Sequence, residues 1–158
     1  MLLVPAPAAA APVPAITNAS GKASILKSLS VLKQSDMDFG ELLVTASGTA
    51  VIDPTSNGLT TTGGVTAIGT TAHAATFTAT GSRNSVVHIK LPTTTVTLTR
   101  TGGTETMTLT NWTMDGSTNR KIPLDDAFNF SVGATLNVAA GQVDGTYTGT
   151  FPITVQYP

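Results

Sequence analysis

Apolar and polar residues alternate along much of the chain, most clearly between residues 145 and 157. In this segment, G-T-Y-T-G-T-F-P-I-T-V-Q-Y, the odd positions are glycine or apolar and the even positions are mostly threonine. Successive side chains of a β-strand point to opposite faces of the sheet. The pattern therefore predicts a strand whose apolar face lies on the wall of a β core and whose other face is rich in hydroxyl groups.

Shorter alternating segments predict further strands through the rest of the chain. We expect them at residues 28–34, 42–45, 49–52, 65–68, 73–79, 86–91, 96–99, 107–113, 128–132 and 134–138. Turn signals separate them, among them the cluster 53–58 and the pair Gly102-Gly103. Residues 115–120 are predicted to form a polar loop. Many short strands and no convincing helix predict an all-β, immunoglobulin-like (pilin-like) sandwich of antiparallel strands.

The segment 17–25 also alternates, but most of its apolar positions are small. One parity carries Ala19, Gly21, Ala23 and Ile25, and the other carries only polar residues. A strand that precedes an already complete-looking set can pair with its own sheet or be donated to the exposed edge of a neighbour. In the donated case, these four side chains would fill the groove of the neighbour.

The closing strand is predicted to border the position where such a strand is added. Its apolar residues Tyr147, Phe151, Ile153 and Val155 form the predicted acceptor edge. Pro152 removes one backbone donor from the same strand, because proline has no N–H group. The chain is therefore divided into a leader at 1–15, a donor-strand segment at 16–27 and a single sandwich domain at 28–158.

The first fifteen residues are small or apolar and contain several prolines. Ala8-Ala9-Ala10 or Val13-Pro14-Ala15 would suit a signal peptidase, although no basic region precedes them. We interpret the segment as the end of a signal peptide or as a disordered leader. No run reaches the roughly 18–20 apolar residues of a transmembrane helix. We therefore expect export through the periplasm to the cell surface, without membrane insertion.

Composition adds to this interpretation mainly by exclusion. The 158 residues have a formal net charge of −1, and only 11% of them are charged, which argues against a basic surface that binds nucleic acid. About 30 threonines suit pleated, half-solvated surfaces. The chain has no cysteine, so an exported form must be stable without disulfides.

The polar residues predict no catalytic, cofactor-binding or metal site. Asp36 and Asp38 share one strand face, but no further partner is defined by spacing, so we expect them to cap a turn. The pair Asp125-Asp126 is interpreted as part of a solvated loop, with weak Ca²⁺ binding as the minor alternative. No serine lies in a G-x-S-x-G motif.

The histidines and the single tryptophan have similarly simple interpretations. His73 and His88 are isolated and match no zinc pattern. Trp112 is expected to pack in the core and not to serve as a sugar-stacking platform. We therefore expect a protein that is not an enzyme.

Three ordered motifs carry a family resemblance. They are Asp36-Met-Asp-Phe-Gly40, Thr62-Gly-Gly-Val65, and Gly133-Ala-Thr-Leu-Asn-Val138 followed by Gly145-Thr-Tyr-Thr-Gly-Thr-Phe151 and Val155. On these motifs, residues 24–157 resemble the secreted bacterial family of domain of unknown function 4402. More distantly, the strand ending in Asp-Phe-Gly and the closing Gly-x-Tyr-x-x-x-Phe strand are similar to the spore-coat-U-like subunits of archaic chaperone–usher pili.

The pilus resemblance implies an incomplete immunoglobulin-like sandwich that polymerises when the N-terminal strand of one subunit completes the next. It also implies a periplasmic chaperone and an outer-membrane usher as partners. This chain differs from the pilus family in lacking the cysteines of its disulfide.

Two classes of function follow. We expect a secreted structural subunit that polymerises head to tail into a surface filament by donor-strand exchange, because head-to-tail contacts generate open filaments. The alternative is a monomeric adhesin or carbohydrate-binding module that uses loops 53–58 and 115–126. Whether the N-terminal strand pairs in its own molecule or in a neighbour distinguishes the two.

Overall fold

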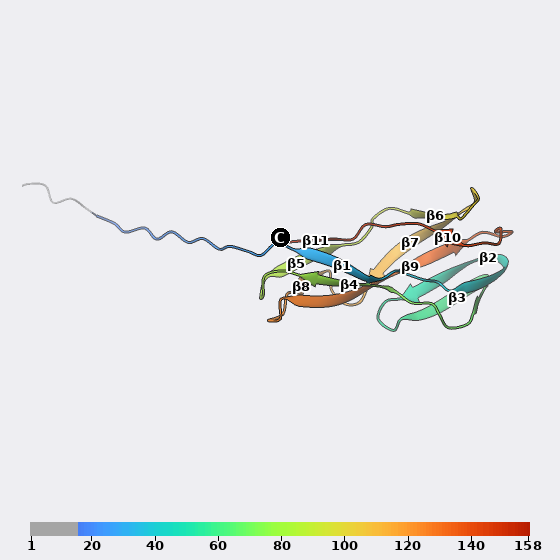
Figure 1. Cartoon of the computed structure of the whole chain (residues 1–158), viewed down its shortest axis with the longest axis horizontal. Coiled ribbons are helices and arrows are strands. Elements are labelled where there is room, and N and C mark those ends of the chain that lie inside the picture. The colour runs from blue at the N-terminus through green and yellow to red at the C-terminus, as the bar shows by residue number, and fades with distance from the viewer. Residues whose placement is uncertain (1–15) are drawn as a thin grey trace, which may run out of the picture.

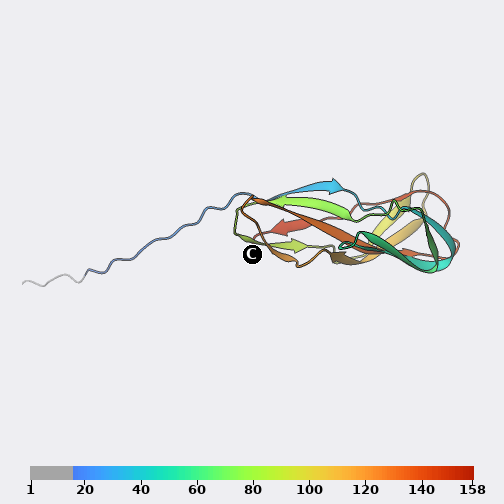
Figure 2. The ribbon, with the colours of Figure 1, turned by 90° about the horizontal axis from the view of Figure 1, so that it is seen from below.

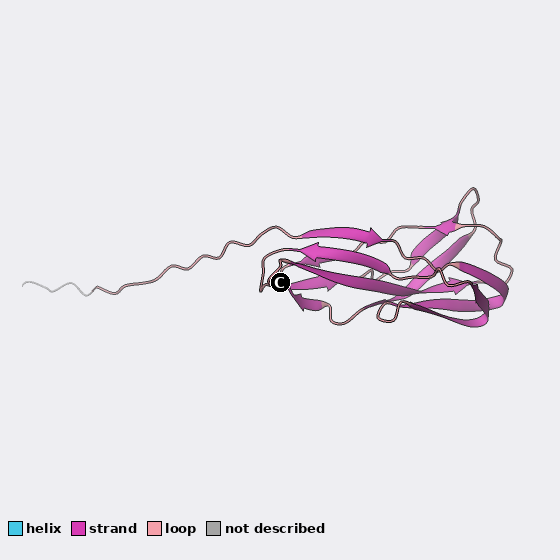
Figure 3. Cartoon of the chain, turned by 60° about the horizontal axis from the view of Figure 1, so that its bottom comes forward, coloured by secondary structure: helices cyan, strands magenta, loops and turns pink. Residues whose placement is uncertain are grey.

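The computed structural model describes residues 16–158, and these residues form strands and loops without a helix (Figure 3). The strands are β1 (Ser30–Ser35), β2 (Glu41–Asp53), β3 (Gly58–Ile68), β4 (Ala75–Thr80), β5 (Val86–Lys90), β6 (Val96–Arg100), β7 (Thr106–Met114), β8 (Asn119–Lys121), β9 (Ala127–Val138), β10 (Tyr147–Thr148) and β11 (Thr154–Gln156). All strand pairings are antiparallel. The predicted all-β antiparallel sandwich is confirmed. The leader predicted over residues 1–15 lies outside the described residues.

The strands form two sheets that lie in separate layers (Figure 2). The larger sheet has the order β1-β4-β9-β7-β6-β10, and the β2–β3 hairpin joins it along the second half of β9. The smaller sheet has the order β11-β5-β8. The series β1-β4-β9-β7 corresponds to strands A, B, E and D of an immunoglobulin sandwich, and β11-β5 corresponds to F and C. Within residues 16–158, no strand occupies the position of G beside β11.

Two apolar clusters form the core: the first lies among strands of the larger sheet, and the second lies between the larger and the smaller sheet. The first contains Ile52, Leu109 and Leu136, and the second contains Phe77, Phe130 and other buried residues of β4, β5 and β9. The rings of Phe77 and Phe130 are stacked, with their centroids 5.2 Å apart. Burying one such large apolar side chain contributes roughly 1.5–3 kcal/mol to folding. The clusters therefore supply a core that needs no disulfide.

The closing strand predicted at 145–157 is split into two short strands. The part named β10 pairs with β6 in the larger sheet, and the part named β11 pairs with β5 in the smaller sheet. The predicted alternation is confirmed, because Tyr147, Phe151, Ile153 and Val155 are partly buried while the even positions are exposed. The strand changes sheets around Pro152, where the missing N–H cannot support a continuous ladder.

Three other differences from the predicted strands have physical causes. The two segments predicted around residue 47 form one strand, β2, with a register shift between Val44 and Gly48. At this shift the two strands of the hairpin approach closely, since a Cβ on Gly48 would lie 2.1 Å from the carbonyl oxygen of Thr62. The segments predicted at 128–138 likewise form one strand, β9. Part of the loop predicted at 115–120 forms β8, whose polar residues pair with β5 at the margin of the smaller sheet.

Candidate site of strand addition

Two unpaired strand edges lie near each other at one pole of the molecule. Among the described residues, 16–158, β1 and β11 each have a neighbour on one side only, β4 and β5 respectively. They belong to different sheets but contact each other where the N-terminal segment leaves the body (Figure 1). Unpaired backbone N–H and C=O groups at such edges can pair with an added strand. The position next to β11 is the one that strand G would occupy.

The free edge of β11 is formed by the backbone groups of its odd-numbered residues. The N–H of Ile89 in β5 donates to the carbonyl oxygen of Thr118, on the β8 side, at 2.8 Å. Backbone groups alternate between the two sides of a strand, so Lys90 directs its groups to Thr154 in β11. The N–H and C=O of Val155 must then point away from β5. They are available to a strand added at this edge.

The free edge of β1 follows from the same alternation. The N–H of Gly81, just beyond β4, donates to Asp126 just before β9, so the odd-numbered residues of β4 bond to β9. Thr80 and Thr78 therefore bond to β1, and the backbone groups of Val31 and Lys33 point outward. The side chain of Lys33 is exposed and pairs with Asp36, 2.5 Å away. A charge on an edge strand limits unspecific pairing at β1, which leaves β11 as the more accessible edge.

Partly buried apolar side chains line the core beside these edges. Val31 from β1 and Phe151, Ile153 and Val155 from the closing strand pack at the margin of the second cluster. The ring of Phe151 lies against Trp112, with 4.7 Å between centroids. The indole nitrogen of Trp112 is buried and has no hydrogen-bond partner among the described residues. Trp112 is partly buried and packs against both apolar clusters, as predicted, and it also lines a pocket with His88, Leu91 and Pro92.

The predicted acceptor residues lie in two separate parts of the closing strand, one near β11 and one in β10. Phe151, Ile153 and Val155 lie beside the open G position. Tyr147 lies farther along, where it pairs with Arg100 and its hydroxyl donates to the carbonyl oxygen of Val143 at 2.6 Å. Pro152 has the parity of Thr154, whose backbone groups face β5. Its missing N–H therefore lies on the side of β5 and not on the free edge.

The predicted donor segment is extended but forms no strand in the single chain. Residues 16–28 are exposed and are paired with no strand of the described chain (Figure 1). Ala19, Gly21, Ala23 and Ile25 therefore contact neither of the two free edges of their own molecule. Ile25 is 97% exposed and Ile16 is 84% exposed. Ile16 lies on the opposite parity from Ile25, so on the small-residue face only Ile25 offers a large apolar side chain to a partner.

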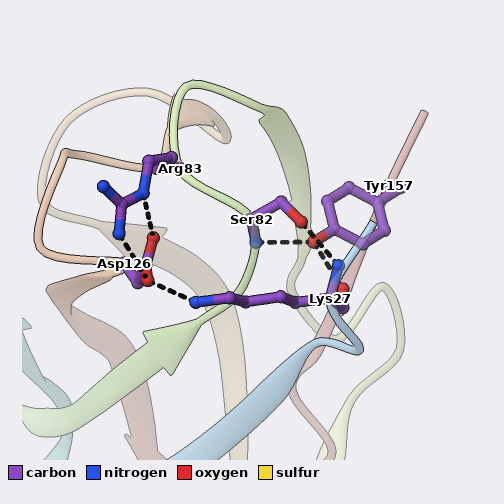
Figure 4. Close-up of polar contacts among 5 residues, drawn as sticks. All are labelled: Lys27, Ser82, Arg83, Asp126 and Tyr157. Carbon is purple, nitrogen blue, oxygen red and sulfur yellow. Dashed lines mark hydrogen bonds and ion pairs between the residues drawn. The ribbon is translucent and has the colours of Figure 1, made fainter. Parts of the chain in front are cut away.

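A polar cluster that the sequence did not predict holds the chain at the end of this segment. The Tyr157 hydroxyl donates to the carbonyl oxygen of Lys27 and accepts from the N–H of Ser82, both at 2.8 Å (Figure 4). The Lys27 ammonium contacts a carboxylate oxygen of Asp126 at 2.5 Å, and Arg83 contacts the other oxygen at 3.2 Å. The interpretation of Asp126 as a solvated loop residue is therefore wrong. We call Lys27, Ser82, Asp126 and Tyr157 the exit cluster.

The contribution of the exit cluster to folding stability is expected to be lost at acid pH. The hydrogen bond from Lys27, followed by that from Arg83, holds the pKa of Asp126 below its ordinary value of 3.8. A lowered pKa in the folded state contributes stability that is present above the unfolded value and is lost as the pH falls through the folded value. The loss of stability caused by Asp126→Asn should therefore be constant above about pH 5 and should disappear below the lowered pKa. Urea unfolding over a pH series measures it.

The neighbouring Asp125 supplies the control for this pH prediction. Its carboxylate forms no ion pair with any residue of the described chain. Asp125→Asn should therefore cost clearly less stability than Asp126→Asn at neutral pH. An Asp126→Asn effect that does not diminish as the pH falls below 3.8, the ordinary pKa of the group, would contradict the assignment of the ion pairs.

The remaining candidate residues have structural surroundings. The Asp38 carboxylate accepts the N–H of Gly40 at 2.8 Å, so the predicted turn cap is confirmed for Asp38, whereas the Asp36 carboxylate pairs with Lys33. The backbone of His73 pairs with Asp38, and the ring of His88 contacts Asn119. Among residues 16–158, no three acidic, histidine or cysteine side chains gather as metal ligands. The same residues contain no helix that could span a membrane.

Comparison with known proteins identifies one family. The model of a family described as Domain of unknown function (DUF4402) matches residues 29–157. The match begins one residue before β1 and leaves the donor segment outside. No curated protein and no solved structure gives a significant match to the chain.

Proposed function

The chain belongs to the DUF4402 family, and we propose that this protein is a secreted structural subunit that polymerises head to tail by donating its N-terminal segment. The observation that carries the proposal is the pairing of two incomplete features in one molecule. The sandwich has an open position beside β11, and residues 16–28 form an exposed segment with no strand partner. The open position can accept a strand, and the exposed segment can supply one.

The dimensions of the two features are compatible. At about 3.3 Å per residue, the eleven residues 16–26 span about 36 Å when extended. The acceptor stretch 149–157 has nine residues and spans about 30 Å on the same scale. The donated strand can therefore cover the whole edge of β11.

The side chains are compatible as well. Ala19, Gly21 and Ala23 are small, and Ile25 is large and 97% exposed in the single chain. The wall they would meet carries large side chains, including Phe151 and Ile153. Alternation of small and large residues lets facing surfaces interdigitate, and burial of the apolar area contributes about 25 cal/mol per Å².

Donation to a neighbour produces a filament for geometrical reasons. The segment leaves one molecule and the open edge belongs to the next, so the contact is heterologous and does not close on itself. The pilus resemblance extends the proposal to a periplasmic chaperone and an outer-membrane usher as assembly partners, with export to the cell surface. The proposed partner within the filament is a second copy of this chain, and no enzymatic activity is proposed.

Removal of the donor segment tests the proposal. Deletion of residues 1–25 keeps Lys27 and the sandwich, so the truncated protein should remain folded but should no longer polymerise. Electron microscopy and size-exclusion chromatography measure the loss. Persistence of filaments in the truncated protein would rule out strand donation.

Two point variants separate the apolar face of the donor from its polar face. Ile25→Asp places a charge on the face that is predicted to be buried, and should reduce assembly strongly because an unpaired buried charge is costly. Ser24→Asp places the same charge one residue away on the predicted solvent face, and should assemble like the wild type. Equal behaviour of the two variants would contradict the proposed face.

The alternative function, a monomeric adhesin or carbohydrate-binding module, has less support. It requires a self-complete sandwich, whereas the segment 16–28 pairs with no strand of its own molecule within the described residues. The tryptophan that would stack on a sugar packs against Phe151. A wild-type protein that stays monomeric at high concentration would favour this alternative.

A further inference from the structure

The exit cluster engages the backbone of Lys27 on both sides of the residue. The N–H of Lys27 donates to the Ser82 hydroxyl at 2.6 Å, and its carbonyl oxygen accepts from the Tyr157 hydroxyl at 2.8 Å. Its ammonium group contacts Asp126, which lies 99 positions farther along the chain. Lys27 is therefore held to three separate parts of the body, just before β1 begins.

The packing below the cluster leaves no room for the hydroxyl of Tyr157 to move inward. A Cβ on Gly81 would lie 2.6 Å from Leu29, 2.7 Å from Ile122 and 2.9 Å from the hydroxyl of Tyr157. Gly81 is itself buried, and its N–H donates to the backbone carbonyl oxygen of Asp126. Tyr157, which follows β11 and contacts Lys27, thus lies against tightly packed residues.

This arrangement opposes the return of the donor segment to its own molecule. β1 leads away from the pole, so a segment that precedes it can reach the free edges of its own molecule only by reversing direction close to Lys27 (Figure 1). A turn that includes Lys27 would change its backbone directions and is incompatible with its two backbone hydrogen bonds. A turn that keeps both bonds must lie before Lys27, which shortens the stretch left to pair with its own molecule. In the structure the segment instead continues outward from the body (Figure 2).

We infer that the exit cluster positions residues 16–26 for addition to another molecule and disfavours addition to their own. The inference rests on the proposed function and adds to it the residues that select the intermolecular reaction. Lys27, Ser82, Asp126 and Tyr157 act as positioning residues, because none of them lies in the donated stretch 16–26. The partner they favour is a second copy of the chain.

The double variant Lys27→Ala/Tyr157→Phe tests the inference. It removes the ion pair and both hydrogen bonds of the tyrosine hydroxyl while retaining the ring. Each lost hydrogen bond changes such an equilibrium by roughly two- to tenfold. We expect the polymerised fraction to fall about tenfold or more, and amide exchange of residues 16–26 in the monomer to slow by a similar factor as the segment pairs with its own molecule.

Lys22→Ala is the matched control, because it removes a lysine within the exposed segment and leaves the exit cluster intact. It should polymerise and exchange like the wild type. Thermal unfolding of the purified monomers identifies any variant that is unfolded. Tyr157→Phe alone, which retains the ring and the ion pair, should show a smaller change in the same direction and can replace a double variant that fails to fold.

The two measurements distinguish failure of this inference from failure of the proposed function. If the variants polymerise like the wild type, and residues 16–26 exchange equally fast in all monomers, the exit cluster has no positioning role. If the wild type itself does not polymerise, the proposed function fails. The inference would then still be supported by slower exchange of residues 16–26 in the variants, and overturned by equal exchange.

Discussion

Val155→Pro is expected to leave the sandwich folded and to abolish its assembly into filaments. The N–H of Val155 points away from β5, so its loss removes no hydrogen bond of the folded subunit. A proline ring on the free edge removes a donor and obstructs an added strand, as prolines do on protective edge strands. Proline also retains an apolar side chain at the margin of the core. Electron microscopy should show no filaments, and urea unfolding should show a small loss of stability.

Thr154→Pro is the matched control one residue away. The backbone of Thr154 faces Lys90, so proline at this position breaks the ladder between β11 and β5. Its main effect should be a loss of folding stability of about 1–3 kcal/mol, because the carbonyl oxygen of Lys90 loses its donor. Normal filaments from the Val155→Pro protein would show that strand addition does not use the edge of β11.

Phe130→Ala is expected to cost about 3–5 kcal/mol of folding stability. Phe130 is 1% exposed, stacks on Phe77 and lies in the middle of the second cluster. Removing its ring leaves a cavity among residues of both sheets, and the rigid ladders of β4 and β9 limit how far the cavity can collapse. Since small domains are stable by only about 5–15 kcal/mol, this variant loses a large part of the total. The midpoint of urea unfolding measures the change.

Phe128→Ala provides the comparison for the core. Phe128 lies two residues away on the same face of β9, but it is only partly buried, and its ring centroid lies 6.0 Å from that of Phe130. Its removal opens a site that water can reach, so the loss of stability should be clearly smaller. Equal losses for the two variants would contradict the position of Phe130 at the centre of the cluster.

In the proposed filament, stability and assembly would use different sides of the same strand. The side chain of Val155 faces the core, the backbone groups of Thr154 and Gln156 face β5, and those of Val155 face the open position. A change at an odd position of the backbone therefore affects the edge, and a change at an even position affects the sheet. The pair Val155→Pro and Thr154→Pro depends on this difference.

Most strands could be predicted from the sequence, because alternation with period two is a local property of a pleated strand. The burial of Phe151, Ile153 and Val155 on one face follows directly from it. The segment 17–25 alternates equally well and yet forms no strand in the single chain. Alternation shows which face of a segment can be buried, but it does not show whether a neighbouring strand is available.

At residues 115–120 a loop was predicted, but part of this segment forms a strand. Asn119–Lys121 has no apolar face of its own, but it pairs with β5 because the fold brings the two segments together. Short strands of this kind are determined by their partners, and the local sequence contains no sign of them.

The all-β sandwich, the small-residue face of segment 17–25 and the apolar face of the closing strand could all be predicted from residues 1–158 as a sequence. The open strand edge, and the position of the missing N–H of Pro152 on the side of β5, became visible in the folded molecule. The tertiary structure also revealed the exit cluster, in which Tyr157 bonds to Lys27 across 130 positions of the chain. The physical reason is that side-chain pattern is encoded within a few neighbouring residues, whereas an edge or a cluster depends on pairing between distant ones.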